Sequence, residues 1–352
     1  MRSHFARKLN LGPAGWLVSK GSFSLSWCQS PVLTYAFRRL LWIIPVLLVA
    51  SIITFGLMHA APGSPWNRES NPLDADTIAA LNARYGLDQP LPVQYVRWLD
   101  GILHGDFGSS FDPGALSGMA IPFKIEHTDV ASVIGQAAGP SLQLGLMAFA
   151  LAVLLGIPLG VVAALRHNGP VDHLATGVSL LGLAAPAFLL AIVLQLALGK
   201  NAYTGEGLFP TKGWDDPISW VLPTVALAAL PMAQVARYTR ASMLEVVGRD
   251  YVRTAESKGL GPSRIVGIHM LRNALIPVVT ILGPILATLI TGSIVVETVF
   301  QIPGIGALYI GAIHQHDYGV IMTMTLIYAA AVALINVVVD LSYGILDPRV
   351  RP

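Results

Sequence analysis

The chain has 352 residues, of which 12% are charged and 54% belong to the set Ala, Val, Ile, Leu, Met, Phe, Trp, Tyr and Cys. Soluble domains carry about 25% charged residues, so this composition excludes an ordinary soluble enzyme, and the high apolar content excludes a disordered chain. The formal net charge of +2 is too small to indicate a nucleic-acid partner, and a single cysteine, Cys28, excludes an internal disulfide.

Six apolar stretches follow one another along the chain, each long enough to cross a membrane. A hydrocarbon core of about 30 Å requires roughly 20 apolar residues in a helix. None of the stretches has Lys or Arg near its middle, where a charge would be costly. The sequence therefore predicts an all-α integral membrane protein with six transmembrane helices, at about Leu40–Ala61, Ser141–Leu165, Leu174–Gly199, Ile218–Ala236, Ala274–Val299 and Val320–Ile345.

The distribution of Lys and Arg predicts the orientation of these helices, because cytoplasmic loops are enriched in basic residues. With the N-terminus inside, sixteen of the 22 basic residues lie in cytoplasmic segments and six in outer segments. The even number of spans then places both termini in the cytoplasm. The expected organisation is a poorly ordered cytoplasmic extension at 1–36, a first transmembrane helix at 37–61, an extracytoplasmic helical cap at 62–140, a core of five helices at 141–346 and a cytoplasmic tail at 347–352.

The outer segment at 62–140 is acidic, with nine Asp and Glu residues against four Lys and Arg residues. Asp74 or Asp76 can cap a helix that stops at Gly86, and a second helix is expected after Pro92. The run from Gly105 to Gly108 predicts a turn. The second helix has apolar residues at helical spacing, which are Val93, Val96, Leu99 and Leu103.

The cytoplasmic segment at 237–273 has a nearly continuous polar helical pattern, interrupted between Lys258 and Pro262. Gly259 suits the left-handed end of one helix, and Pro262 suits the first turn of the next. Two short helices would form a compact knob, and a bare linker between two spans needs far fewer residues. Two interpretations remain open from the residues alone: solvated helices whose charges fix the topology, or a docking knob for a cytoplasmic partner.

Motifs for catalysis and metal binding are missing from the sequence. It contains no GxxxxGK[ST] phosphate-binding loop, no HExxH motif and no pair of cysteines for zinc. It also lacks the GxSxG turn that presents a nucleophilic serine. We therefore predict neither a catalytic site nor a metal site in this chain.

The knob sequence resembles the EAA loop of ABC importer permeases, in the form found in the peptide-uptake branch. The matching runs are Asp250–Leu260 and His269–Pro277; Arg253-Thr254 replaces Glu-Ala of the general pattern, whereas Ala255 and Gly259 match it. The resemblance extends from about Tyr35 onward and implies the type I ABC importer permease fold of an oligopeptide permease B-type subunit. Further matching runs, in the same order along the chain, are Ala61–Pro65, Tyr85–Pro90, Gly105–Gly108, Glu297–Phe300, Pro303–Gly306 and Asp347–Arg349.

This resemblance implies a membrane-spanning subunit of an ATP-driven importer of oligopeptides or dipeptides in the bacterial cytoplasmic membrane. It implies four kinds of partner: a second homologous permease subunit, two ATP-binding subunits that hold ATP and Mg, an extracytoplasmic peptide-binding protein and the lipid bilayer. The chain itself is expected to bind no cofactor and no nucleic acid. The residues expected to couple it to the ATP-binding subunits are Glu245, Arg249, Asp250, Tyr251, Arg253, Thr254, Ala255, Lys258 and Gly259.

The fifth span is rich in small residues, which permit close helix packing and equally suit a path for a bulky solute. Glu297, near the outer end of this span, is an isolated acid close to the membrane and hence a functional candidate. It is a residue of the path, an anchor at the membrane interface, or a hydrogen-bond partner for the backbone of the turn at Pro303-Gly304. The candidate substrate-path residues are Gly283, Thr288, Thr291, Gly292 and Glu297.

Alternatives to peptide import remain open at this stage. Related permeases carry nickel or glutathione, and the sequence does not distinguish a homodimeric from a heterodimeric permease pair. A secondary transporter driven by an ion gradient is a different class, typical of chains with inverted repeats, broken helices or acids near the midplane. No repeat is visible, and the carboxylates lie near the interfaces. A membrane-bound scaffold or sensor without transport is a third class.

Overall fold

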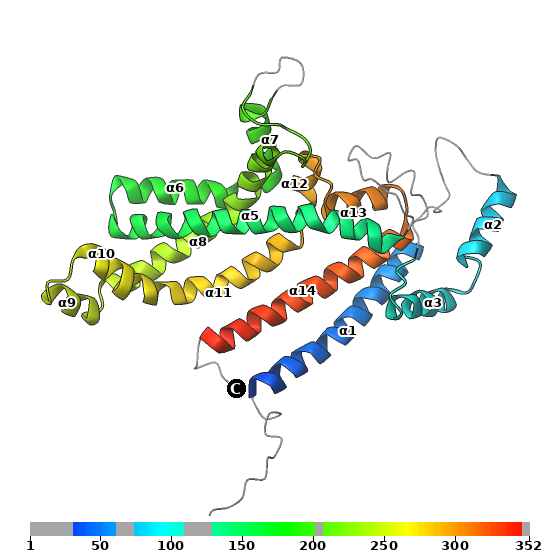
Figure 1. Cartoon of the computed structure of the whole chain (residues 1–352), viewed down its shortest axis with the longest axis horizontal. Coiled ribbons are helices and arrows are strands. Elements are labelled where there is room, and N and C mark those ends of the chain that lie inside the picture. Colours follow the sequence, from blue (N-terminus) through cyan, green and yellow to red (C-terminus); the bar gives the residue numbers. More distant parts are fainter. Residues whose placement is uncertain (1–30, 61–73, 109–128, 201–206, 347–352) are drawn as a thin grey trace, which may run out of the picture.

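The computed structural model describes residues 31–60, 74–108, 129–200 and 207–346. The regular elements in these ranges are all helices (Figure 1), and the one β-type contact named between described residues is an isolated bridge from Gly199 to Phe209. The tail expected at 347–352 and residues 1–30 of the expected N-terminal extension lie outside the described residues. The first described helix, α1, begins at Pro31, within that extension.

Five helical segments of the described chain are long and apolar enough to cross a membrane, and a bent pair supplies a sixth. The predicted all-α membrane fold is thereby confirmed. In Figure 1 the start of α1 and the end of α14 lie at the same end of the molecule, as an even number of crossings requires. The main helices of the spans are α1 (Pro31–Ala60), α5 (Val130–Leu165), α6 (Pro170–Ala184) with α7 (Ala187–Leu198), α8 (Val221–Val247), α11 (Leu271–Ile290) and α14 (Tyr318–Leu346).

The third predicted span, Leu174–Gly199, is not the continuous helix that its apolar content suggested. α6 and α7 meet at an angle of 109°. Ala185, between them, has extended backbone angles, because the proline that follows it, Pro186, disfavours the helical conformation of the preceding residue. Figure 1 shows α6 lying along α5, whereas α7 points in a different direction. α7 still packs on the same two long helices, since Ala191 is buried in one cluster with Leu144 of α5 and Leu222 of α8.

Two other predicted boundaries also differ from the structure. α11 ends at Ile290, before the predicted end of the fifth span at Val299, because Gly292 has a φ of 87° in the left-handed region. The short helices α12 (Ile294–Val299) and α13 (Ile305–His314) follow it. α5 begins at Val130, inside the range expected for the cap, and continues through Pro140, since membrane helices tolerate proline when neighbouring groups satisfy the backbone.

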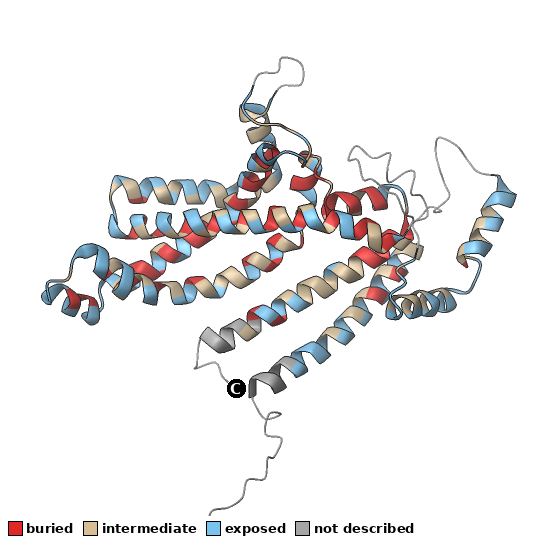
Figure 2. Ribbon diagram, viewed as in Figure 1, coloured by how far each residue is buried: buried red, intermediate tan, exposed pale blue. Residues whose placement is uncertain are grey.

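Close packing between α5 and α8 forms the centre of the molecule. Gly156 and Gly160 of α5 both face α8, and a Cβ atom added to Gly160 would lie 2.5 Å from the Ala236 carbonyl oxygen. Small residues four apart allow membrane helices to approach in this way. Figure 2 shows buried residues along α8 and α13, whereas most of α1 is exposed.

The change Gly160→Ala is expected to destabilise the protein by about 1–3 kcal/mol, the usual cost of overpacking. The matched control is Gly135→Ala on the same helix, because a Cβ added to Gly135 has no neighbour within 4 Å. The measurement is the thermal unfolding of each purified variant in detergent. Equal losses of stability in both variants would contradict the glycine-mediated contact.

The first cap helix agrees with the sequence prediction. α2 (Ala75–Tyr85) begins after Asp74, whose carboxylate accepts hydrogen bonds from the Thr77 hydroxyl and backbone N–H, and these bonds hold the pKa of Asp74 below its usual value. Gly86 ends the helix with a φ of 70°. The predicted turn is also present: Gly105 and Gly108 have positive φ values, and the Asp106 side chain accepts a hydrogen bond from the Gly108 N–H.

The second cap helix, α3 (Leu91–Leu103), is also present, and aromatic residues between the apolar positions that predicted it contact the first span. Val96 and Leu103 are 63% and 77% exposed, whereas Tyr95 and Trp98 pack with Phe55 of α1. The Tyr95 hydroxyl also lies 2.8 Å from the Ser51 hydroxyl of α1. Aromatic rings offer more contact area and a polar group besides, so they hold α3 against the first span.

Candidate functional site

The two short helices predicted between the fourth and fifth spans are present, at the end of the molecule opposite α2 and α3 (Figure 1). Residues 237–247 of the predicted loop form the last turns of α8. After Gly248 and Arg249 come α9 (Asp250–Ser257), a reversal at Gly259 with a φ of 74°, α10 (Pro262–Arg264) and a π-helical segment, η3 (Ile265–Met270). We call residues 248–270 the knob.

A small hydrophobic core fixes the knob to the ends of the long helices. Val252 and Ala255, three residues apart on α9, are buried in one cluster with Met243 of α8 and Ala164 of α5. The same cluster includes Ile265, Met270 and Ala274, which lie on η3 and α11. α9 therefore shares a buried core with four other segments, α5, α8, η3 and α11.

The surface of the knob is polar and charged. Tyr251 is 40% exposed, and no described residue forms an ion pair with Arg249, Arg253 or Lys258. Ala255 is the exception among the predicted coupling residues, since it faces inward and is 4% exposed. The exposed members of the predicted set are Glu245, Arg249, Asp250, Tyr251, Arg253, Thr254, Lys258 and Gly259.

Glu297 is enclosed by backbone and side-chain donors and is 0% exposed. Its Oε1 atom accepts hydrogen bonds from the Ser141 hydroxyl of α5 at 2.8 Å and from the Ser293 N–H at 3.2 Å. Its Oε2 atom accepts bonds from the Gly306 and Ala307 N–H groups at 2.7 and 3.3 Å. The carboxylate therefore joins α12 to α5 and to the N-terminal turn of α13, where helix backbone favours negative charge.

This geometry favours one of the three interpretations that the sequence left open for Glu297, a hydrogen bond to backbone at the Pro303-Gly304 turn, here to the N–H groups just after it. Glu297 reaches no surface through which a solute could pass in the described chain. The sequence did not identify Ser141, its hydroxyl partner, although a serine beside Pro140 in an apolar stretch was a visible signal.

The other candidate path residues separate into two groups. Thr291 and Gly292 line a cavity of about 330 Å³ together with residues of α13 and α14, among them Tyr309 and Tyr328. Thr288 is exposed on α11, and Gly283 of α11 packs against Val339 of α14. The structure thus brings two of the predicted residues to one cavity, and the course of a substrate path stays a prediction.

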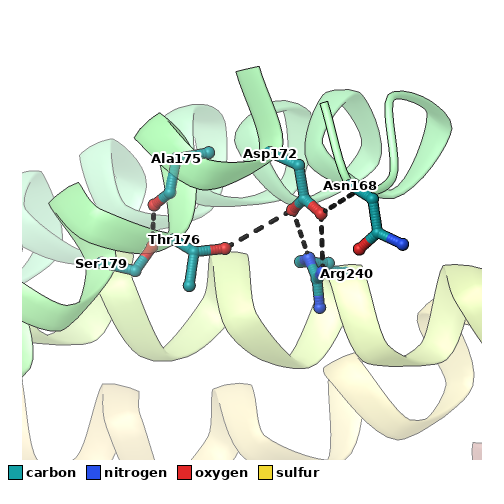
Figure 3. Close-up of polar contacts among 6 residues, drawn as sticks. All are labelled: Asn168, Asp172, Ala175, Thr176, Ser179 and Arg240. Atoms are coloured by element: carbon teal, nitrogen blue, oxygen red, sulfur yellow. Dashed lines mark hydrogen bonds and ion pairs between the residues drawn. The ribbon is translucent and has the colours of Figure 1, made fainter. Parts of the chain in front are cut away.

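An ion pair that the sequence did not predict connects α6 to α8 (Figure 3). The Arg240 guanidinium donates from Nε to Asp172 Oδ1 at 2.6 Å and from a terminal nitrogen to Asp172 Oδ2 at 2.7 Å. Asp172 is 2% exposed and also accepts a bond from the Asn168 N–H at 2.9 Å. The Thr176 hydroxyl lies 3.5 Å from Oδ1. We call the Asp172–Arg240 pair the clamp.

Comparison with known protein families identifies the chain. A family model described as the binding-protein-dependent transport system inner membrane component matches residues 156–352. The chain belongs to this family. A second model, for the N-terminal part of membrane components of these transport systems, matches residues 23–137. The match confirms the resemblance to permeases inferred from the motifs and, with the apolar helices, the predicted location in a bacterial inner membrane.

Several permeases of peptide transport systems are similar to this chain over nearly its whole length. The dipeptide transport system permease protein DppB of Bacillus subtilis is 42% identical over 317 residues, which cover 90% of this chain and 97% of that protein. The oligopeptide transport system permease proteins OppB of Haemophilus influenzae and Escherichia coli K12 are 37% and 35% identical, each over 91% of this chain and 100% of their own length.

A solved permease structure shows the same fold. A chain of the MetNI methionine ABC transporter, in inward-facing conformations, matches 62% of this chain and 97% of its own length, with a TM-score of 0.50 and 18% sequence identity. This agreement confirms the predicted ABC importer permease fold. The permease orientation with both termini in the cytoplasm stays a prediction.

Proposed function

We propose that this chain is the membrane-spanning subunit of an ATP-driven importer of dipeptides or oligopeptides. The observation that carries the proposal is the knob, a packed pair of helices with an exposed charged surface, in a chain 42% identical to a dipeptide permease. Peptides come to the chain from an extracytoplasmic binding protein, and the six apolar segments enclose their route into the cytoplasm.

The energy for import comes from other subunits. Two ATP-binding subunits hold ATP and Mg, and a second homologous permease completes the membrane part. This chain has no catalytic role of its own: it receives movement at the knob and changes the access of the membrane path. Because Val252 and Ala255 pack with residues of α5, α8 and α11, displacement of the knob acts on several spans as rigid levers.

A secondary transporter is not favoured by these observations. The break between α6 and α7 is a feature that such transporters also have. The family match covers the knob, however, and an ion-driven transporter has no need for a cytoplasmic docking surface of this kind. Nickel or glutathione as cargo is not favoured either, because the similar proteins are permeases of dipeptide and oligopeptide transport systems.

The change Tyr251→Ala tests whether the knob binds ATP-binding subunits. Tyr251 is a large exposed side chain on α9, and aromatic residues of this kind contribute strongly to interfaces. We expect affinity for the ATP-binding subunits to fall about 10-fold or more, since loss of a major contact costs about 2 kcal/mol. The measurement is co-purification of these subunits with the tagged chain from solubilised membranes.

The matched control is Tyr238→Ala, because Tyr238 is 43% exposed on α8 and lies outside the knob. This variant is expected to retain the ATP-binding subunits at the wild-type level. Equal retention by both variants would show that Tyr251 makes no important contact. An intact wild-type chain that never associates with an ATP-binding subunit would contradict the proposed function itself.

A further inference from the structure

Roughly two to three turns from the clamp, α6 and α8 meet through small residues. A Cβ atom added to Gly182 of α6 would lie 3.1 Å from the Ala229 carbonyl oxygen and from the Ala233 Cβ atom. Small side chains permit close approach but interlock poorly along the helix axis. The clamp differs in kind, because a bidentate arginine–carboxylate pair fixes both distance and orientation. It therefore sets the axial register of α6 on α8.

The clamp lies close to the knob. Arg240 is on α8 seven residues before Val247, where that helix ends, a distance of about 10 Å along a helix axis at 1.5 Å per residue. Gly248 and Arg249 alone separate that end from α9. A movement of the knob is thus delivered first to the part of α8 that holds Arg240.

The opposite end of the broken span contacts the segment beside the cavity. α6 continues through Pro186 into α7, where the Gln195 side chain donates hydrogen bonds of 2.9 Å to the carbonyl oxygens of Val299 and Thr211. Val299 ends α12, which also contains Glu297, and Ile294 of the same helix lines the 330 Å³ cavity. The α6–α7 pair therefore reaches from the clamp to the wall of that cavity.

We propose that Asp172 and Arg240 are positioning residues that make α6 follow α8 when the knob moves. The inference rests on the proposed function, because it assigns the clamp a role in coupling ATP hydrolysis to peptide uptake. Without the clamp, α8 slides along the small residues of α6. α7 and α12 then move less than the knob does. ATP hydrolysis then continues with less peptide transported for each ATP.

The test compares single and double neutral variants in the complete complex, reconstituted in lipid vesicles with its partner subunits. Asp172→Asn and Arg240→Gln each leave one charge without its partner, so both are expected to lower membrane abundance as well as transport. The double variant has no unpaired charge, and its abundance is expected to recover. Its ratio of peptide transported to ATP hydrolysed is expected to stay at least about fivefold below wild type, which corresponds to about 1 kcal/mol of lost coupling.

The control is Arg237→Gln, since Arg237 is exposed on the same helix and forms no ion pair with described residues. It is expected to keep the wild-type ratio. Recovery of both abundance and ratio in the double variant would overturn the proposal, because the clamp would then serve stability alone. An equal fall in the ratio of peptide transported to ATP hydrolysed in Arg237→Gln would also overturn it.

A distance measurement separates this proposal from the proposed function. Spin labels are placed at the exposed positions Leu180 of α6 and Val247 of α8, by changing each to Cys in a Cys28→Ser background. With the clamp intact, the distance between the labels is expected to be narrowly distributed; in the double neutral variant, it is expected to broaden. Unchanged distributions would refute the positioning role, whether or not the wild-type complex transports peptides.

Discussion

Replacement of Glu297 by glutamine is expected to cause a large loss of folded protein. The carboxylate accepts four hydrogen bonds, two at each oxygen. The NH₂ group of a glutamine must replace one acceptor oxygen; on the Oε1 side the Ser141 hydroxyl can turn to accept from it, but the Ser293 N–H is left without an acceptor. An unsatisfied buried donor costs about 1–3 kcal/mol. The expected cost is therefore about 1–3 kcal/mol, a substantial part of the 5–15 kcal/mol that typically stabilises a protein.

The measurement for this change is the fraction of protein that is monodisperse after solubilisation from membranes. Glu256→Gln is the matched control, because Glu256 is exposed on α9 and the same chemical change there removes no buried bond. We expect Glu256→Gln to fold like the wild type. A Glu297→Gln variant that folds normally but loses peptide transport would contradict the structural role and support a place for Glu297 on the substrate path.

The second large effect is expected from Gly259→Val, in transport rather than in folding. Gly259 has a φ of 74°, a conformation that costs other residues about 1–2 kcal/mol and is especially unfavourable for a β-branched side chain. A Cβ atom added there has no neighbour within 4 Å, so the strain is local to the turn after α9. We expect the knob to change shape and peptide transport per ATP to fall about 10-fold or more.

Gly261→Val provides the control for this prediction. Gly261 lies two residues further along the same exposed turn, has no neighbour within 4 Å of an added Cβ atom, and has a φ of −64° that valine readily adopts. Both variants are expected to reach the membrane in similar amounts, and Gly261→Val to transport normally. Equal transport by both valine variants would show that the left-handed turn is unimportant for coupling.

Local signals in the sequence predicted the spans and the knob correctly. Apolar length is enough to recognise a membrane helix, and the Gly259 and Pro262 pair marks the ends of two short helices. The same length criterion missed the break before Pro186, because mean hydropathy does not register a single proline. The proline itself was visible in the sequence and could have located the bend.

Contacts between distant residues could not be read from such signals. Glu297 and Ser141 are 156 positions apart, and Arg240 and Asp172 are 68 positions apart. The two residues of each pair lie on different helices, so the spacing of apolar residues along one helix cannot predict that they meet. The contact between α3 and α1 could not be predicted for a related reason: Val96 fits an apolar stripe, but the residues that pack with Phe55 of α1 are Tyr95 and Trp98.

The central claim is that ATP hydrolysis by partner subunits drives peptide uptake through this chain. The most direct measurement is uptake of a labelled dipeptide or oligopeptide by vesicles that contain the complete complex and the extracytoplasmic binding protein. We predict uptake that requires ATP and persists when ion gradients are dissipated. Uptake that continues without ATP and stops when the ion gradient is dissipated would contradict the account.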